Sequence, residues 1–372
     1  MGGSSASLFS LVTGLDKNRY DPAVLFYYPS LVADKLRDMG YQVLTPRPRV
    51  KGRKRAPVPV PFVSGERRAA LSYHKLFFTL MLPESLRLAR LFRDVQPDLV
   101  HCNMSPPSDL AAVVASRLSR IPCVCHVRDF GKIYRIHKLS SRFIAFFICI
   151  SEAIRQSYLR LGIRGSRLAL VHNGVDLMEF RPDPEAPRPN DTFTVTQIGR
   201  LIGWKGQRVL LQAVPIVLRK FPRAQFVLVG DGPDRIALER FAAELGIGNQ
   251  VRFPGMVADV RPLLAAADII VLPSISPEPF GRTVIEAMAM EKPVIATAMG
   301  GPAEIITPLV DGLLVKPDDP ALLAEKIISL AGNRDAAREL GRRARKTVAA
   351  RFDARRTVRE VEGIYERAME GR

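Results

Sequence analysis

The sequence is poor in the residues that define disulfide-bonded and membrane-spanning proteins. Its 372 residues include four cysteines, all in the first half and in or beside apolar runs: Cys102, Cys123, Cys125 and Cys149. Buried thiols explain these positions, and nothing indicates a disulfide framework. No signal peptide opens the chain, and no apolar run reaches the ~18 residues that a membrane span needs. We therefore expect a globular protein of the cytoplasm.

Ligands for a metal ion are also sparse. Cys123, Cys125 and His126 are close in sequence, but strand residues alternate between two faces, so His126 is expected opposite both thiols. The chain has no Asp-x-Asp pair that could hold a divalent cation between two carboxylates. We predict that the protein uses neither a metal nor another cofactor.

Acidic residues are scarce in the first half of the chain. Residues 1–180 carry 27 Lys and Arg against 13 Asp and Glu, whereas residues 181–372 carry 28 against 24. Much of the excess lies in the Pro-rich segment 45–68, called the basic segment below. Such a cluster attracts anionic lipid headgroups or nucleic acid, and a solvated basic loop is the alternative. Nucleic-acid binding would need aromatic platforms, yet the basic segment offers only Phe62.

The chain is too long for one core and has enough apolar residues for two. Its 372 residues, 47% hydrophobic and 25% charged, predict a globular protein of two domains. Short apolar strands alternate with amphipathic helices in both halves, which predicts α/β domains with parallel sheets covered on both faces. We predict an N-terminal domain over 1–172, a C-terminal domain over 173–354 and a last helix, 355–372, that crosses back to the first domain.

The start of the chain departs from this pattern. The chain opens on Met-Gly-Gly-Ser-Ser, whereas a doubly wound domain normally places a strand before such a glycine turn. We expect that the first strand is missing. Strands are expected at 23–28, 41–44, 98–102, 123–127 and 143–150 in the first half, and at 193–198, 225–229, 251–253, 269–272, 294–296 and 312–315 in the second.

The most informative motif runs from Ser274 to Pro293 and follows an apolar strand. Open α/β sheets bind ligands at the carboxyl ends of their strands. Glu278 precedes a Pro-Phe-Gly turn, and Glu286 is predicted about one turn into the next helix. Two carboxylates at this spacing suit the vicinal hydroxyls of a sugar and of a ribose, and the intervening helix N-terminus suits phosphate. A charged helix cap would explain Glu278 but not the turn with its glycine.

A second motif, Ile198 to Gln207, forms a glycine-broken turn after the first strand of the second half. Arg200 and Lys205 project from this turn, and two fixed cations there would neutralise a departing diphosphate. A turn with Arg and Lys is weak evidence by itself. Together with the two carboxylates it predicts a site for a sugar diphosphate.

With these motifs in place, the chain resembles the retaining glycosyltransferases of family 4, which have the GT-B fold: two Rossmann-like domains that face each other across a cleft. The resemblance covers nearly the whole chain. Besides the two motifs, three further segments match the family pattern: Val-Gly-Asp-Gly-Pro at 229–233, His-Asn-Gly-Val-Asp at 172–176 and Val-Ile-Ala-Thr-Ala-Met-Gly-Gly at 294–301.

The resemblance implies roles for residues of the second half. Glu278 would contact hydroxyls of the donor sugar, and Glu286 would hold the ribose. Arg200 and Lys205 would stabilise the departing diphosphate. The remaining positions would act through the backbone: Phe280 and Gly281 near the sugar and phosphate, Gly230 and Val257 at the border of the base.

In the first half, the resemblance implies that His126 lies near the anomeric carbon and that Gly3 belongs to a glycine loop under the phosphates. A structural histidine is the commoner role for a single His, and we expect that role for His172. Without a strand before Gly3, the position of its loop is the point at which this chain departs from the family.

The resemblance implies a retaining hexosyltransferase that takes a nucleotide-diphosphate sugar as co-substrate, without a metal. The basic segment and an apolar helix around 76–82 predict a saccharide or lipid-linked acceptor, as in polysaccharide biosynthesis of the cell envelope, and peripheral binding to an anionic membrane surface. Two alternatives remain: a sugar-nucleotide epimerase of the same double fold and a non-catalytic basic binding protein. We expect no nucleic-acid partner.

Overall fold

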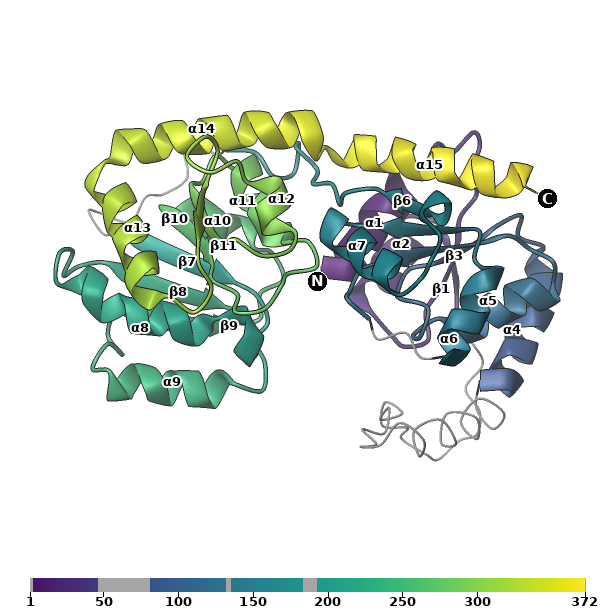
Figure 1. Cartoon of the computed structure of the whole chain (residues 1–372), viewed down its shortest axis with the longest axis horizontal. Helices are drawn as coiled ribbons and strands as arrows, with labels where there is room; N and C mark the ends of the chain where they lie inside the picture. The colour runs from purple at the N-terminus through teal and green to yellow at the C-terminus, as the bar shows by residue number, and fades with distance from the viewer. Residues whose placement is uncertain (1–2, 46–80, 132–134, 183–192, 372) are drawn as a thin grey trace. The chain divides into compact units, whose positions relative to one another are not determined.

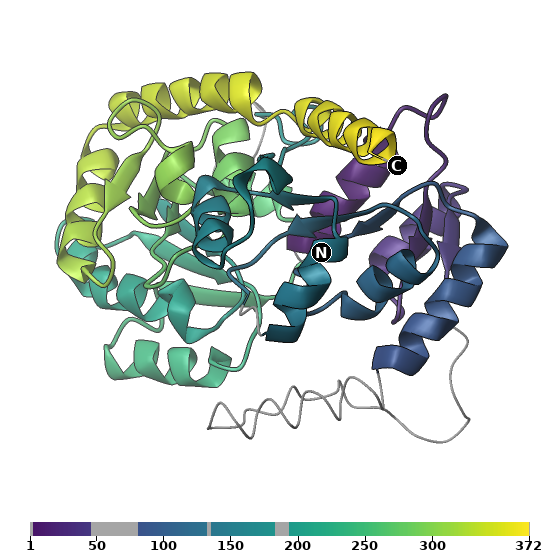
Figure 2. The same cartoon turned by 45° about the vertical axis from the view of Figure 1, so that its right-hand side comes forward.

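The computed structural model describes residues 3–45, 81–131, 135–182 and 193–371. The chain divides into two compact units, drawn in Figures 1 and 2. Unit 1 contains residues 1–148, 159–169 and 361–372, and unit 2 contains 149–158 and 170–360. Nearly all of the basic segment, and most of the apolar helix expected around 76–82, lie outside the described residues.

Unit 2 is built around a six-stranded sheet in the order β12-β11-β10-β7-β8-β9. All neighbouring strands pair in parallel, as the alternation of strands and helices predicted. The strands are β7 (Thr194–Ile198), β8 (Gln225–Val229), β9 (Val251–Gly255), β10 (Ile269–Leu272), β11 (Val294–Thr297) and β12 (Leu313–Val315).

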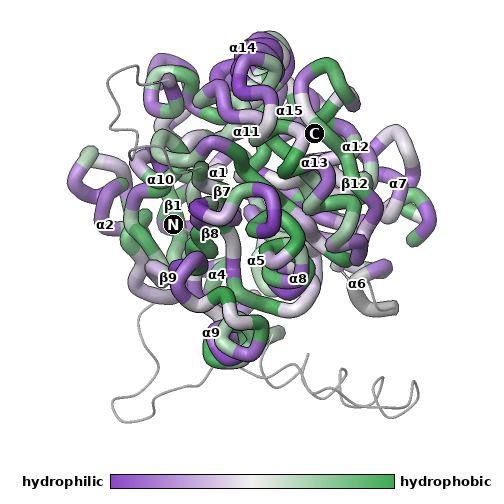
Figure 3. Tube along the Cα trace, turned by 90° about the vertical axis from the view of Figure 1, so that its left-hand side faces the viewer, coloured by the Kyte–Doolittle hydropathy of each residue, from purple (hydrophilic) through white to green (hydrophobic). Residues whose placement is uncertain are grey.

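The helices of unit 2 follow these strands in turn. They are α8 (Gln207–Leu218), α9 (Arg235–Glu244), α10 (Arg261–Ala266), α11 (Arg282–Ala289), α12 (Pro302–Ile305), α13 (Pro320–Gly332) and α14 (Arg334–Arg351). Helix α8 packs against α13, and α11 packs against α14. The trace of α14 alternates between hydrophilic and hydrophobic residues in Figure 3. Its buried residues recur every three or four positions, as in an amphipathic surface helix.

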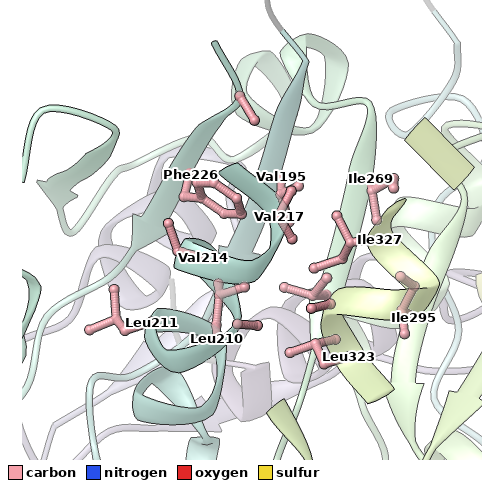
Figure 4. Packing of buried hydrophobic residues seen from close by; sticks show 14 of the residues in the cluster. Val195, Leu210, Leu211, Val214, Val217, Phe226, Ile269, Ile295, Leu323 and Ile327 are labelled. Atoms are coloured by element: carbon pink, nitrogen blue, oxygen red, sulfur yellow. The ribbon is translucent and has the colours of Figure 1, made fainter. Parts of the chain in front are cut away.

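The main core of unit 2 lies between the sheet and two helices on one face (Figure 4). In the sheet, Val195 is paired with both Phe226 and Ile269, so one register directs all three side chains to the same face. Leu210 of α8 and Ile327 of α13 pack against them. A slip of one residue would turn this apolar set to the opposite face, so the register is strongly specified.

Unit 1 holds two sheets where the sequence predicted one. A two-stranded parallel sheet contains β1 (Ala23–Leu25) and β2 (Gln42–Leu44), and a four-stranded sheet has the order β3-β4-β5-β6. Its strands are β3 (Val100–Cys102), β4 (Cys123–Val127), β5 (Phe146–Cys149) and β6 (Leu168–Leu170). The strands β1 and β2 have three residues each and pair with one another in parallel.

The helices of unit 1 include α1 (Gly3–Gly14), α2 (Leu31–Asp38), α4 (Leu82–Val95), α5 (Leu110–Leu118) and α6 (Arg135–Ser140), and α7 (Glu152–Arg160) begins in unit 2. The described chain opens on α1. No described helix is long and apolar enough to cross a membrane.

The last helix, α15 (Ala354–Glu370), contributes its final residues to unit 1. There Glu366 forms an ion pair with Arg19, and Glu362 accepts a hydrogen bond from the backbone N–H of Asp16 at 2.9 Å. Tyr365 is buried, and its hydroxyl lies 2.6 Å from Nδ1 of His101. Polar contacts on two sides therefore fix the end of α15 within unit 1.

Candidate functional site

The predicted site residues of unit 2 follow the carboxyl ends of four neighbouring strands. Arg200 and Lys205 follow β7, Gly230 follows β8, Val257 follows β9, and Glu278 follows β10. Because these strands are parallel, their carboxyl ends meet at one edge of the sheet, which is where open α/β sheets bind ligands. The fold alone therefore gathers these loops.

Gly206 brings the loop after β7 against the loop after β10. Its backbone is left-handed, with φ +70°, and a Cβ there would lie 1.8 Å from the carbonyl oxygen of Pro273. Only glycine permits this approach. The contact is fixed by a hydrogen bond of 2.9 Å from the N–H of Ile275 to the carbonyl of Trp204. The turn therefore carries Lys205 to the β10 loop.

Lys205 and Glu278 form a buried ion pair at this contact. The ammonium donates to both carboxylate oxygens of Glu278, at 2.7 and 2.9 Å, and the Ser274 hydroxyl donates to Oε1 at 2.5 Å. Glu278 is only 3% exposed. Nζ of Lys205 also lies 4.4 Å from the centre of the Trp204 ring, a cation–π contact. The structure therefore brings together two residues that the sequence predicted separately.

Two further glycines hold the segment from Glu278 to Phe280 in place. Gly301 donates its N–H to the carbonyl of Glu278 at 2.9 Å. A Cβ on Gly300 would lie 2.2 Å from the Glu278 carbonyl, and one on Gly301 would lie 2.1 Å from that of Phe280. The glycine pair that follows β11 is thus required by the close packing of two backbone segments.

Glu286 lies on α11, which begins immediately after Gly281. Gly281 has φ +95°, and α11 starts at Arg282, so Glu286 is about one turn inside the helix, as predicted. Its carboxylate accepts a hydrogen bond of 2.6 Å from Nε of Arg282. Burial raises the pKa of Glu286, and Arg282 opposes that rise. The positive end of the α11 dipole lies beside the Glu278 segment.

Gly230 and Val257 occupy another corner of the same sheet edge. Gly230 has φ +135°, and a Cβ there would lie 2.0 Å from the carbonyl oxygen of Gly199. Its N–H donates to the carbonyl of Gly255 at 2.9 Å, and the half-buried Val257 follows two residues later.

Arg200 differs from its predicted partners: it is exposed, and its side chain makes no hydrogen bond or ion pair with the residues described.

Unit 1 contains the two remaining predicted site residues, Gly3 and His126. Gly3 is the exposed first residue of α1. His126 lies in β4 and is 2% exposed. Burial lowers the pKa of His126 well below its usual value, and the charge of Arg128 and the neighbouring His101 lower it further.

Several residues of the site were given no role from the sequence. Ser274 and Arg282 lie within the motif 274–293, and the structure shows that they hold its two carboxylates. Glu304 of α12 accepts from the first N–H groups of α7, at 2.6 Å from Glu152 and 2.7 Å from Ala153. Within the described ranges, no group of three or more His, Cys, Asp or Glu is arranged to hold a metal ion.

His172 packs against the segment from Glu278 to Phe280, a contact that suits the structural role expected for it. Its ring centre lies 6.0 Å from that of Phe280 and 5.4 Å from that of Phe352. Its Nε2 lies 3.5 Å from a carboxylate oxygen of Glu304. The segment 172–176 is also packed: the N–H of Val175 donates to the carbonyl of Phe352 at 2.9 Å.

Comparison with known proteins identifies this arrangement as that of a glycosyltransferase. The family model described as Glycosyltransferase Family 4 matches residues 1–179, and the model described as Glycosyl transferases group 1 matches residues 181–347. A Bacillus subtilis (strain 168) protein named "Putative glycosyltransferase EpsD" is 30% identical over 319 residues, covering 77% of this chain and 82% of that protein. The chain belongs to the family 4 glycosyltransferases.

Other relatives agree with this assignment. The lipopolysaccharide core biosynthesis glycosyltransferase LpsD of Rhizobium meliloti (strain 1021) is 27% identical over 313 residues, 81% of this chain and 85% of that protein. The solved structure of HepE from Anabaena in complex with UDP-glucose superposes with a TM-score of 0.80 at 22% identity, covering 99% of this chain and 96% of that one. The fold is GT-B.

The close approach at Gly206 predicts a position-specific loss of stability. We expect Gly206→Ala to lower the free energy of unfolding by more than Gly246→Ala. Gly246 is the matched control, because its φ of +69° is the same but nothing lies within 4 Å of a Cβ there. The control should lose about 1–2 kcal/mol from backbone strain alone. Urea unfolding followed by circular dichroism measures both, and equal losses would contradict the packing described for Gly206.

Proposed function

We propose that this glycosyltransferase moves a hexose from a nucleotide-diphosphate sugar to a saccharide or lipid-linked saccharide, with retention of anomeric configuration and without a metal ion. The observation that supports it is the buried pair of Lys205 and Glu278 beside the N-terminus of α11. A carboxylate and an ammonium fixed side by side match a sugar hydroxyl and a phosphate, which are neighbours in such a donor.

Glu278 has room to accept a hydroxyl in addition to its present partners. Its Oε1 accepts from both Lys205 and Ser274, whereas among the described residues Oε2 accepts from Lys205 alone. Each carboxylate oxygen has about two lone-pair sites. One site on Oε2 therefore remains for a donor-sugar hydroxyl. Glu286, held by Arg282, would accept from the ribose in the same way.

Positive charge from the protein would take the place of a metal ion at the diphosphate. Lys205 is fixed in position, Arg200 is exposed at the rim of the same loop, and the N-terminus of α11 presents the backbone of Phe280 and Gly281. Fixed cations and helix amides stabilise a departing diphosphate without reorganisation during the reaction.

Retention requires the new bond to form on the face from which the diphosphate leaves. In the proposed step, the bond between the anomeric carbon and the phosphate oxygen breaks while the acceptor oxygen bonds to that carbon. The acceptor's proton passes to the departing phosphate oxygen. This route needs no nucleophile from the protein, and Glu278 is already held by Lys205 and Ser274.

Uracil is the first nucleobase to test in the donor. The similar Anabaena protein HepE has been solved with UDP and with UDP-glucose. In this chain the base would lie against Gly230 and Val257 and be read through backbone groups. No specific observation favours the epimerase or the non-catalytic binding protein.

Retention and metal independence are tested in one assay. Purified protein is incubated with UDP-, GDP- and ADP-hexoses and a saccharide acceptor, with and without EDTA, and the anomeric configuration of the product is read by proton NMR. We expect an α-linked product from an α-linked donor and an unchanged rate in EDTA. An inverted product would reject the proposed step, and loss of activity in EDTA that magnesium restores would reject metal independence.

We propose further that transfer takes place at an anionic membrane surface, on the cytoplasmic side. The support is the charge of the basic segment and the kind of process named for the relative LpsD, lipopolysaccharide core biosynthesis. Electrostatic attraction predicts co-sedimentation with phosphatidylglycerol vesicles and none with phosphatidylcholine vesicles, weakening as salt rises. Binding that ignores anionic lipid content would count against this proposal.

A further inference from the structure

The guanidinium of Arg128 is held in one orientation at the carboxyl ends of two adjacent strands. Arg128 follows β4, and Asn103 follows β3, which pairs with β4 in parallel. Nε of Arg128 donates to the carbonyl and to the side-chain oxygen of Asn103, at 3.2 and 3.0 Å, and Nη2 donates to the same side-chain oxygen at 2.8 Å. Arg128 is 8% exposed. Its guanidinium group is therefore both buried and fixed in orientation.

This fixed cation determines which nitrogen of His126 carries the proton. Nη2 of Arg128 lies 3.3 Å from Nδ1 of His126. Arginine has only donor groups, so in this contact Nδ1 must be the acceptor and carries no hydrogen. A neutral imidazole with an unprotonated Nδ1 has its proton on Nε2.

The surroundings of His126 also keep its ring neutral. The charged and titratable groups that face it are Arg128, which follows the same strand, and His101 of β3, whose ring centre lies 5.4 Å away. The Nδ1 of His101 is in turn engaged by the buried Tyr365 hydroxyl at 2.6 Å. Burial lowers the pKa of both histidines, to about 3 for His101. Neither Arg128 nor His101 supplies a negative charge that would stabilise an imidazolium at His126.

The protonated Nε2 of His126 has no partner within the described part of the chain. That atom is buried and makes no hydrogen bond there. A buried N–H without an acceptor is unfavourable, and native proteins rarely keep one unless a ligand or water supplies the acceptor. The unpaired N–H is therefore free to donate to a ligand oxygen.

We propose that Arg128 is a positioning residue that fixes His126 as a neutral imidazole with its proton on Nε2, so that His126 donates a hydrogen bond to a saccharide oxygen and does not act as a base. This inference rests on the proposed function for the identity of the ligand. The lone pair of Nδ1 faces the Arg128 cation, and Nε2 has no lone pair to offer. His126 in this state therefore cannot act as a base towards the saccharide.

The protonation of His126 is measured without any substrate. In full-length protein labelled with 15N-histidine, long-range proton–nitrogen spectra distinguish the two neutral tautomers and the imidazolium. His126→Gln assigns the signal among the five histidines. We expect the Nε2–H tautomer from about pH 8 to about pH 5.5, below the usual histidine pKa of about 6.5. An Nδ1–H signal, or an imidazolium in that range, would overturn the proposal.

Variants at Arg128 test its part in this state. Arg128→Met removes donor and cation, so the pKa of His126 should rise and the imidazolium should appear at higher pH than in the wild type. Arg128→Lys keeps a cation and should retain most of the wild-type behaviour. Arg93→Met, at an exposed position on α4, is the control and should change nothing. If Arg128→Met leaves both the tautomer and the titration unchanged, Arg128 has no positioning role.

Transfer activity provides the second measurement. We expect Arg128→Met to lower kcat about tenfold, the loss of one aligned hydrogen bond in the transition state, and Arg128→Lys to recover most of it. An unchanged kcat for Arg128→Met, in protein that melts like the wild type, would contradict the role of His126 as a donor. If the wild-type protein transfers no sugar at all, the proposed function fails, while the NMR result still decides the state of His126.

Discussion

The ion pair of Lys205 and Glu278 is the interaction on which the arrangement of the site depends. Glu278 is almost fully buried, and a buried carboxylate is tolerated only with a partner and further hydrogen bonds. Removing one member of such a pair typically costs about 3–5 kcal/mol. The backbone is accordingly built to bring the two together: glycines at 206, 300 and 301 stand where a Cβ would collide with a carbonyl oxygen.

A pair held this closely prepares the site before a ligand arrives. Oriented charges that need no rearrangement stabilise a developing diphosphate better than charges that must first be recruited from solvent. The same logic applies in unit 1, where Asn103 fixes Arg128 and Arg128 fixes His126. In unit 2 both members of the pair would contact the donor, whereas in unit 1 Arg128 would orient His126 without contacting the substrate itself.

Much of this could be predicted from the sequence, because the relevant signals are local. The strands of unit 2 are short apolar runs between glycine and proline turns, and all six were expected close to where they lie. The spacing of Glu278 and Glu286 placed one in a loop and one in a helix, which is confirmed. The GT-B fold and the family followed from motifs of consecutive residues.

What could not be predicted depends on contacts between distant residues. Lys205 and Glu278 are 73 residues apart. They meet because Gly206 lets the loop after β7 approach the loop after β10, and no local sequence pattern predicts that approach. Arg200 was predicted to act together with Lys205 on the diphosphate, but unlike Lys205 its side chain is exposed. The separation of β1 and β2 into their own sheet was likewise missed, because strands of three residues carry little periodicity.

Calorimetry with two ligands tests the central claim, that Glu278 binds the sugar while Lys205 binds the diphosphate. Wild type, Glu278→Gln, Lys205→Met and the exposed control Lys346→Met are each titrated with a nucleotide sugar and with the matching nucleoside diphosphate. For Glu278→Gln we predict at least about tenfold weaker binding of the nucleotide sugar, about 1.4 kcal/mol, with the diphosphate bound as well as before. For Lys205→Met we predict weaker binding of both. Equal losses for both ligands in Glu278→Gln, or none, would contradict the account.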